Sequence, residues 1–186
     1  MTKHIMAAAL CAVSLWGCRS RVTGGPAIEL GEFHTQVNMW VEHPKPILTT
    51  NYHMGTMIPT GAPVTLIAGN AKDIRFRWNG GEHVLRLDAR NTRVSMGTVQ
   101  TRLFKKSNPL ESAAFTTLTE AQQAAVRNGQ VVEGMTKEAV LMAYGYPPER
   151  ETPSTEVDRW IYWRSRFMPR KSVTFEDGKV SATVGF

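Results

Sequence analysis

The sequence predicts an α+β fold in two parts, and three observations lead to that prediction. Short stretches rich in β-branched and aromatic residues, separated by turn residues, fill positions 33–104. Two segments with helix-capping residues follow between 119 and 145, and extended stretches return from 159 to the last residue. We therefore expect a small antiparallel β-barrel or sheet followed by a module of two helices and a sheet. The composition, with 42% hydrophobic and 20% charged residues, is that of an ordinary globular protein.

Residues 1–17 have the pattern of a bacterial export signal. Lys3 is followed by an apolar stretch, 5–16, that is shorter than the ~20 residues of a membrane-spanning helix. The ending Leu15-Trp16-Gly17-Cys18 resembles the lipobox of bacterial lipoproteins. That resemblance implies cleavage before Cys18 and attachment of acyl chains there, and Arg19 favours the outer membrane. The alternative, a signal peptide cut nearby, would leave an unpaired thiol in an oxidising compartment.

The charge of the chain restricts its partners. The sequence has 22 Lys and Arg against 16 Asp and Glu, which gives a formal net charge of +6. In the periplasm a basic surface meets anionic lipid, lipopolysaccharide or acidic protein surfaces, so we expect no nucleic acid and no nucleotide as ligand. Residues 18–30 are polar, contain Gly and Pro and show no periodicity, which predicts a flexible tether.

Residues 31–106 read as a β-rich small-barrel domain. Ile74, Phe76 and Trp78 alternate with arginines, and the turn Asn79-Gly80-Gly81 follows them, which is a hairpin signal. The composition of residues 58–63 predicts another turn. The expected strands are 33–42, 47–54, 62–69, 73–79, 82–88 and 99–106.

A charged segment containing Asn-Pro, 105–112, predicts a boundary, and residues 112–186 read as a second, α+β domain. Thr119 and Gln122 form a capping-box pattern, and Asn128-Gly129 predicts the end of that helix. The second helix should begin at Thr136 and end at Gly145, which is expected to have a positive φ. Two strands should follow, at 159–167 and 171–186, with Asp177-Gly178 as the hairpin turn in the second stretch.

Three motifs occur in a fixed order in this second domain: GMTKEAVLMAYGYPP at 134–148, WIYW at 160–163, and VTFEDGKV at 173–180. In that order, over about 118–186, they resemble the BamE (SmpA/OmlA) family of outer-membrane lipoproteins. The fold-defining residues are Gly134, Met135, Thr136, Val140, Gly145 and Pro147. The resemblance implies a helix-helix-sheet module, anchorage at the periplasmic face of the outer membrane and a protein partner. The outer-membrane protein assembly complex is one candidate partner.

Motifs of catalysis and of metal binding are incomplete or missing from the sequence. The segment from Gly129 to Thr136 has P-loop spacing, but Met135 stands where the phosphate-binding lysine is required. The histidines after the signal are nine or more residues apart and lack clustered carboxylates: His34, His43, His53 and His83. There is no G-x-S-x-G motif and no nucleophilic Cys. We therefore expect no enzyme activity, no cofactor and no metal.

The stretch from 159 to 171 interleaves arginines with aromatic residues. Alternation along a strand places Trp160, Tyr162 and Arg164 on one face, and Ile161 and Trp163 on the other. We expect the helices to cover Ile161 and Trp163. Trp160, Tyr162 and Arg164 are then an exposed surface of the residue types that are enriched at protein interfaces. The alternative is a strand that buries one aromatic face beneath solvated arginines and binds nothing.

Together these expectations describe a non-enzymatic lipoprotein of the outer membrane that faces the periplasm. Its C-terminal module would bind an envelope protein during assembly or maintenance of the envelope. The alternative is a ligand-binding lipoprotein that holds peptidoglycan or anionic lipid through its N-terminal β domain.

Overall fold

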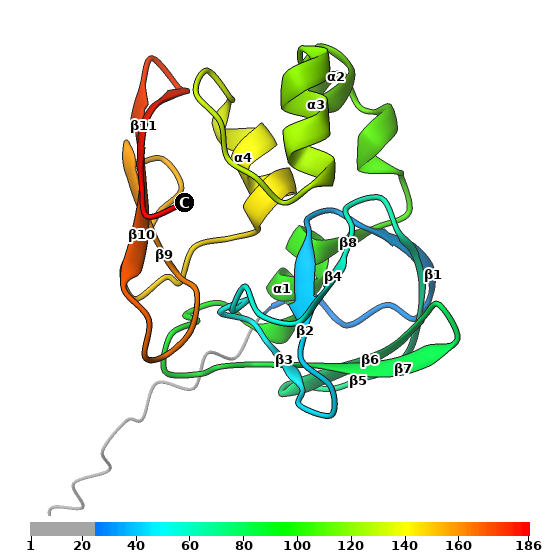
Figure 1. The fold of residues 1–186 in the computed structure, drawn as a ribbon. Coiled ribbons are helices and arrows are strands. Elements are labelled where there is room, and N and C mark those ends of the chain that lie inside the picture. Colours follow the sequence, from blue (N-terminus) through cyan, green and yellow to red (C-terminus); the bar gives the residue numbers. More distant parts are fainter. Residues whose placement is uncertain (1–24) are drawn as a thin grey trace, which may run out of the picture.

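The computed structural model describes residues 25–186, and within them it shows an α+β fold with separate β and helical layers. The N-terminal strands are β1 (Gly31–Thr35), β2 (Met39–Val41), β3 (Ile47–Leu48), β4 (Thr56–Ile58), β5 (Pro63–Gly69), β6 (Asp73–Trp78), β7 (Gly81–Arg86) and β8 (Phe104–Lys105). Six of them form one curled sheet in the order β3-β7-β6-β5-β1-β8, and β2 pairs with β4 (Figure 1). The expected signal, 1–17, and Cys18 lie outside the described residues.

The hairpin of β6 and β7 follows the sequence pattern closely. Ile74 and Phe76 are fully buried, whereas the arginines between them face solvent. Asn79 and Gly80 have φ angles of 47° and 77°, so the predicted turn is confirmed. The sheet is not wholly antiparallel as expected, because β3 pairs with β7 in parallel.

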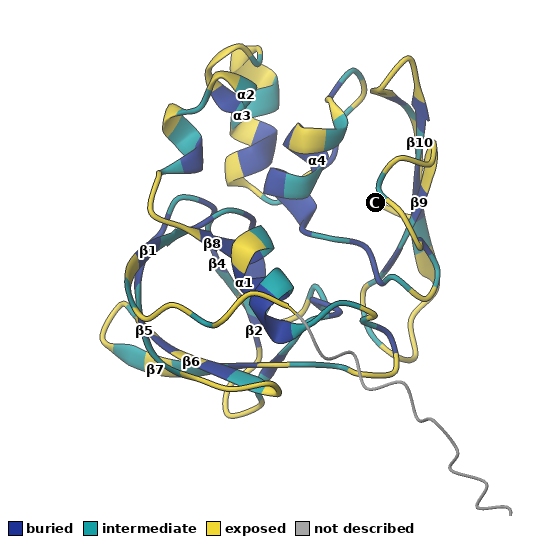
Figure 2. Ribbon diagram, turned by 180° about the vertical axis from the view of Figure 1, so that it is seen from behind, coloured by how far each residue is buried: buried dark blue, intermediate teal, exposed yellow. Residues whose placement is uncertain are grey.

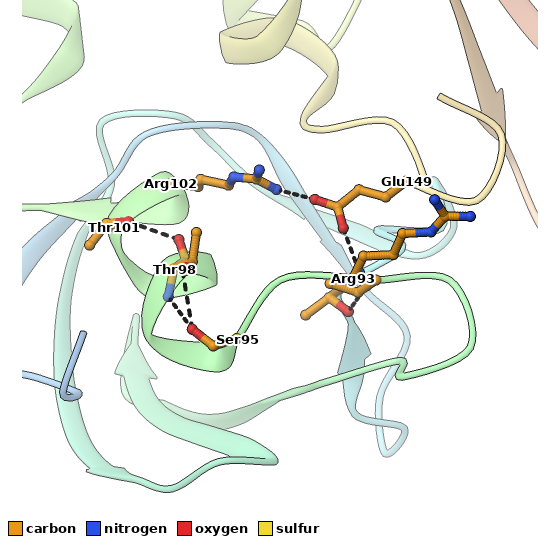
Figure 3. Close-up of polar contacts among 8 residues, drawn as sticks. Arg93, Ser95, Thr98, Thr101, Arg102 and Glu149 are labelled. Atoms are coloured by element: carbon orange, nitrogen blue, oxygen red, sulfur yellow. Dashed lines mark hydrogen bonds and ion pairs between the residues drawn. The ribbon is translucent and has the colours of Figure 1, made fainter. Parts of the chain in front are cut away.

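Residues 99–106 were expected to form a strand, and that expectation is wrong for most of them. They lie in α1 (Met96–Leu103), which runs into the two-residue strand β8. The Ser95 hydroxyl accepts a hydrogen bond from the Thr98 amide and caps the helix (Figure 3). Met96, Val99 and Leu103 then follow helical spacing and face the core. The strand prediction overlooked this spacing.

The expected strand 33–42 is divided because the backbone between β1 and β2 bonds to other segments. The Gln36 amide donates to the Leu103 carbonyl oxygen at 2.8 Å. The Asn38 amide donates to the Met142 carbonyl oxygen at 2.9 Å. The first bond extends the pairing of β1 with β8, whereas the second connects the chain to α4, so the strand ends between the two. In the expected strand 47–54, only Ile47–Leu48 pair.

The helices begin and end where their capping residues predict. A 3-10 turn, η1 (Pro109–Glu111), lies in the expected boundary 105–112, and a short helix that was not expected, α2 (Ala113–Thr116), follows it. The capping box of Thr119 and Gln122 is present at the start of α3 (Glu120–Arg127). Thr136 caps α4 (Lys137–Tyr144), and Gly145 after it has a φ of 79°, so its positive φ is confirmed. Its ψ of −175° is extended, so it is not the left-handed helical cap.

The C-terminal sheet consists of β9 (Arg159–Trp163), β10 (Arg170–Glu176) and β11 (Lys179–Val184), in the order β11-β10-β9. Figure 1 shows that its inner face is turned toward α4. Trp160 and Tyr162 are 0% and 1% exposed, so the expectation that they form an exposed surface is wrong. The Trp160 ring packs on Phe175 at 4.7 Å, and the Tyr162 hydroxyl donates to the Gly145 carbonyl oxygen at 3.0 Å. Ile161 and Trp163 are the half-buried outer residues.

Residues 25–30, in the expected tether, have no regular secondary structure but lie against the fold (Figure 2). The Glu29 amide donates to the Gln100 side chain at 2.9 Å, and the Gln100 side chain donates back to the Glu29 carbonyl oxygen at 2.6 Å. Ile28 packs on the N-terminal core. For these residues the expectation of a free tether is corrected, because both an apolar and a polar contact hold them.

Two hydrophobic clusters divide the described chain, and polar contacts join them. One cluster draws on residues 28–104 with Tyr146, and the other on 110–180 with Trp40. Asn38, which is fully buried, donates through Nδ2 to the Val126 and Ala143 carbonyl oxygens at 2.7 and 2.8 Å.

No helix within residues 25–186 is long and apolar enough to cross a bilayer.

A second connection between the two clusters is electrostatic. The Arg102 guanidinium of α1 contacts the Glu149 carboxylate at 2.6 Å, and the same carboxylate accepts a hydrogen bond from the Arg93 amide (Figure 3). Because the Glu149 side chain is 13% exposed, this pair is shielded better than a surface salt bridge.

Candidate functional site

The end of β9 lies between two hollows. Trp163, the last residue of β9, lines a groove on the outer side of the sheet. Arg164, the next residue, lines a pocket on the inner side. We call these the outer groove and the inner pocket. Strand alternation explains the division, because successive side chains point to opposite faces.

The outer groove has a volume of about 670 Å³ and an arginine-rich lining. It is built from the ends of β3, β7 and β9, the start of β10, and the loops that follow β3, β7, α4 and β9. The lining residues are Leu48, Tyr52, Arg86, Leu87, Asp88, Ala89, Arg90, Asn91, Arg150, Trp163, Ser165, Arg166, Met168 and Arg170. The lining thus contains five arginines and one acidic residue, Asp88.

Two of the groove arginines have carboxylate partners. Arg86 contacts Asp73 at 2.8 Å, and Arg170 contacts Glu151 at 2.9 Å. The other three form no ion pair within the described residues: Arg90, Arg150 and Arg166. All three are exposed. A ligand with more than one negative charge would therefore find several unpaired cations in the groove.

Aromatic rings from both parts of the chain line the outer groove. The Tyr52 and Trp163 rings stack at 6.4 Å with an interplanar angle of 21°. The Arg170 guanidinium lies 5.3 Å from the Trp163 ring centroid. Exposed arginines beside stacked aromatics combine charge with a flat apolar surface, which is a frequent composition of interface hot spots.

The rim of the outer groove carries exposed apolar side chains. Phe167 is 91% exposed and Met168 is 45% exposed, on the loop between Arg166 and Arg170. A neighbouring hollow of about 450 Å³ continues along the same loop and is lined by Trp40, Met54 and Phe167 among others. Such exposure of a phenylalanine flanked by cations is typical of a contact surface.

The inner pocket has a volume of about 580 Å³ and lies where α4 no longer covers the sheet. Its lining residues are Trp40, His53, Asn128, Gly129, Gln130, Val131, Val132, Tyr144, Arg164, Lys171, Thr183 and Phe186. Lys171 lies 4.7 Å from the Phe186 ring centroid and 5.4 Å from that of Tyr144. Burial, and then the charge of Arg164, lower the pKa of Lys171.

His53 lies at the bottom of the inner pocket. Its ring stacks on Tyr144 at 3.6 Å, and its Nε2 hydrogen-bonds the Tyr144 carbonyl oxygen at 2.9 Å. Its Nδ1 is buried with no hydrogen-bond partner among the described residues. Burial lowers the pKa of His53 to about 4, and burial raises that of Tyr144 to about 12. Both side chains are therefore neutral near pH 7.

The structure separates the residues that the sequence grouped as a partner surface. Trp160, Tyr162 and Arg164 do belong to one face, but α4 covers the first two and leaves only Arg164 at the open end. Of the fold-defining residues, Gly134 and Gly145 have positive φ, Thr136 caps α4, and Met135, Val140 and Pro147 are buried. They shape the module and line neither hollow.

Sequence reasoning missed the N-terminal residues of the outer groove, chiefly Tyr52, Arg86 and Arg90. They lie more than 70 residues before Trp163 in the chain, and no motif connects the two segments. Within the described residues no group of three or more His, Cys, Asp or Glu side chains is arranged to hold a metal. The arrangement instead suits binding of an anionic group through arginines.

Searches for similar proteins match no protein-family model, no curated protein and no solved structure.

Proposed function

We propose that the protein is a non-enzymatic lipoprotein at the periplasmic face of the outer membrane, and that it binds an acidic surface of another envelope protein. The outer groove, with its five arginines around Tyr52 and Trp163, is the observation that carries the proposal. The membrane location rests on the lipobox-like sequence ending at Cys18. The similarity of residues 118–186 to the BamE family supports a role in envelope assembly or maintenance.

The chemistry of the groove favours carboxylates. An arginine guanidinium can donate two parallel hydrogen bonds to one carboxylate, and Arg90, Arg150 and Arg166 are not engaged in ion pairs within the described residues. The exposed Phe167 and Met168 add apolar contact area at the rim. Charge complementarity of this kind raises the rate of association and selects the partner.

A second candidate function is contact with anionic lipid headgroups, and a specific observation favours it. The exposed Phe167 lies in the loop segment between Arg166 and Arg170, and an exposed aromatic residue among cations suits the boundary of headgroups and acyl chains. Gly25, the first described residue, lies against Ser95, four residues beyond the groove residue Asn91. Seven residues of chain from Cys18 reach at most about 25 Å. An acyl anchor would thus hold the groove near the membrane.

A photo-cross-linking experiment in cells tests the proposal. A benzophenone amino acid replaces Phe167, and its adducts are compared in the otherwise unchanged protein, in Arg166→Glu and in Arg164→Glu. We expect one dominant protein adduct that Arg166→Glu removes and Arg164→Glu, on the inner side, retains. Adducts to lipid alone would support the second candidate. A protein adduct that survives Arg166→Glu would refute binding through the groove.

The anchoring part of the proposal has its own test. In Cys18→Ser the lipoprotein peptidase should no longer cut the precursor, and no acyl chain should be attached. Mass spectrometry of the mature wild-type protein should show Cys18 at the first position, carrying lipid. An unmodified Cys18 would remove the basis for the membrane location.

A further inference from the structure

The sheet formed by β9, β10 and β11 has an open edge. β11 is the outermost strand, and β10 pairs with it from Glu176 to Ser172. On its other side only Val180 has backbone partners: its carbonyl oxygen accepts from Gly134 at 2.8 Å, and its amide donates to Met135 at 2.8 Å. Within the described residues, 181–184 make no backbone hydrogen bond beyond β10. An unpaired edge is a template for another strand.

A wedge-shaped space lies beside this open edge. The segment 134–136 runs antiparallel to β11 and bridges to Lys179. The preceding residues, 130–132, line the inner pocket together with Thr183. The two segments therefore meet at Val180 and separate beyond it, and the inner pocket occupies the space between them; Figure 1 shows the loop before α4 next to β11.

The side chains of the wedge would recognise a carboxylate. Thr183 pairs with the core residue Val173, so it points to the inner face, as Lys171 does opposite Tyr162. Arg164 and Lys171 supply the charged side chains of the pocket lining, which contains no Asp or Glu. Neither forms an ion pair within the described residues. Trp40, Val131, Tyr144 and Phe186 supply apolar walls.

We infer that the inner pocket binds an extended peptide segment of a partner protein, which adds as a fourth strand to residues 181–184 of β11 and places a carboxylate at Lys171 and Arg164. The open edge supplies main-chain hydrogen bonds, and the pocket accepts alternate side chains of the added strand. Gly185, with a φ of 81°, ends β11 and limits the paired length to a few residues. This site is separate from the outer groove and does not depend on the proposed function.

The carboxylate has two sources in a peptide, the C-terminus and an Asp or Glu side chain. Both would meet the same cations. Lys171 lies toward the Gly185 end of β11, since a Cβ on Gly185 would contact Lys171 at 3.5 Å. Arg164 lies toward the same end, because it follows Trp163, which pairs with Arg170. A terminal carboxylate at that end requires a strand parallel to β11, whereas an acidic side chain permits either direction.

Selection from a display library of random short peptides tests the inference with the full mature protein. Enriched peptides are synthesised, and their Kd is measured on wild type, Arg164→Glu and Arg166→Glu. We expect Arg164→Glu to raise the Kd about tenfold or more. Arg166→Glu, the matched control on the outer groove, should leave the Kd within about twofold of wild type. Weaker binding of a C-terminally amidated peptide identifies the C-terminus as the carboxylate. Weaker binding of a peptide with Asn or Gln in place of Asp or Glu identifies the side chain.

Two further measurements identify strand addition itself. Bound peptide should slow hydrogen exchange of the 181–184 amides, and N-methylation at alternate positions of the peptide backbone should abolish binding. Peptides that bind Arg164→Glu as well as wild type, or that leave exchange at 181–184 unchanged, would overturn the inference. A library from which no peptide is enriched would also overturn it. Because Arg166→Glu impairs only the outer groove, failure here and failure of the proposed function are distinguishable.

Discussion

Gly145 joins the end of α4 to the C-terminal sheet, and its backbone geometry leaves no room for a side chain. Its φ of 79° with a ψ of −175° lies in a region that only glycine occupies readily. A Cβ there would lie 2.5 Å from Asn51 Nδ2, and the Gly145 carbonyl oxygen accepts the Tyr162 hydroxyl. This residue therefore sets the relative positions of α4, Asn51 and β9.

We expect Gly145→Ala to destabilise the protein by about 2–4 kcal/mol, from backbone strain and displacement of Asn51. Gly80→Ala is the matched control, because Gly80 has a φ of 77° but no atom within 4 Å of its Cβ position. It should cost about 1 kcal/mol, from strain alone. Urea unfolding of both variants measures the difference. Equal losses would show that the contact with Asn51 has no effect.

His53 makes stability depend on pH. Its pKa is about 4 in the folded protein because burial disfavours the charged ring, against an ordinary value of 6.5. Between pH 6.5 and 4 the unfolded chain therefore binds more protons, so stability falls as pH falls. We expect His53 to contribute up to about 3 kcal/mol of this loss.

Comparison with His53→Gln isolates the effect, since the carboxylates titrate in both proteins. The wild type should lose more free energy of unfolding than the variant between pH 7 and pH 5. The charge of Lys171 lowers the pKa of His53 in the same direction as burial. Parallel pH profiles for the two proteins would contradict the assignment.

At the scale of the elements, the two faces of β9 differ, because Trp160 is buried in the core and Trp163 lines the outer groove. Trp160→Ala should cost about 3–5 kcal/mol, because the ring is fully buried against Phe175. Trp163→Ala should cost less than about 2 kcal/mol, because that ring is half-buried and lines the outer groove. Thermal unfolding of the two variants ranks them. A larger loss in Trp163→Ala would invert the assignment of faces.

The elements show which parts of the fold local sequence patterns determine. Thr119 with Gln122, Thr136 and the Asn79-Gly80 turn were predictable because each acts on its own few residues. The period of β9 was predictable as well. The sequence did not predict which face of β9 is buried, because both faces carry a tryptophan. The packing of α4 and the bond to Gly145 decide that Trp160, and not Trp163, is buried. In α1, the buried residues Met96, Val99 and Leu103 have helical spacing, which the strand prediction for 99–106 overlooked.

At the scale of the whole molecule, Asn38 links the two clusters. Its Nδ2 donates to two carbonyl oxygens of the C-terminal helices, and its Oδ1 accepts from the Thr60 amide at 2.6 Å. We expect Asn38→Ala to cost at least about 2 kcal/mol, because the buried Thr60 amide and Ala143 carbonyl oxygen lose this partner, while the Val126 carbonyl oxygen keeps only the Gly129 amide. Unfolding monitored by circular dichroism and by tryptophan fluorescence measures the loss.

Asn70→Ala is the control for this substitution. Asn70 accepts from the Lys72 and Asp73 amides in an exposed turn, where water can replace it. Its loss should stay below about 1 kcal/mol. Equal effects of the two substitutions would show that the buried link contributes no more than a surface turn.

The sequence alone did not predict the outer groove, because the groove forms only when distant parts of the chain pack together. Its arginines come from two separate parts of the chain, and a scattered exposed arginine is ordinary in either part. Only the packing of the clusters brings Arg90 near Arg166. The sequence singled out Arg164 because it follows an aromatic strand. It did not show that Arg164 lines the inner pocket.

The bonds made by Asn38 also bear on the order in which parts of the chain can fold. They reach Val126 and Ala143, which lie 88 and 105 residues further along the chain. A chain that emerges from its N-terminus, during synthesis or export, cannot satisfy this buried amide until nearly all of α4 has appeared. Closing contacts of such length is slow. Asn38 therefore lacks these partners until the helices form, and a partly folded chain of this kind is more exposed to aggregation and proteolysis than the finished fold.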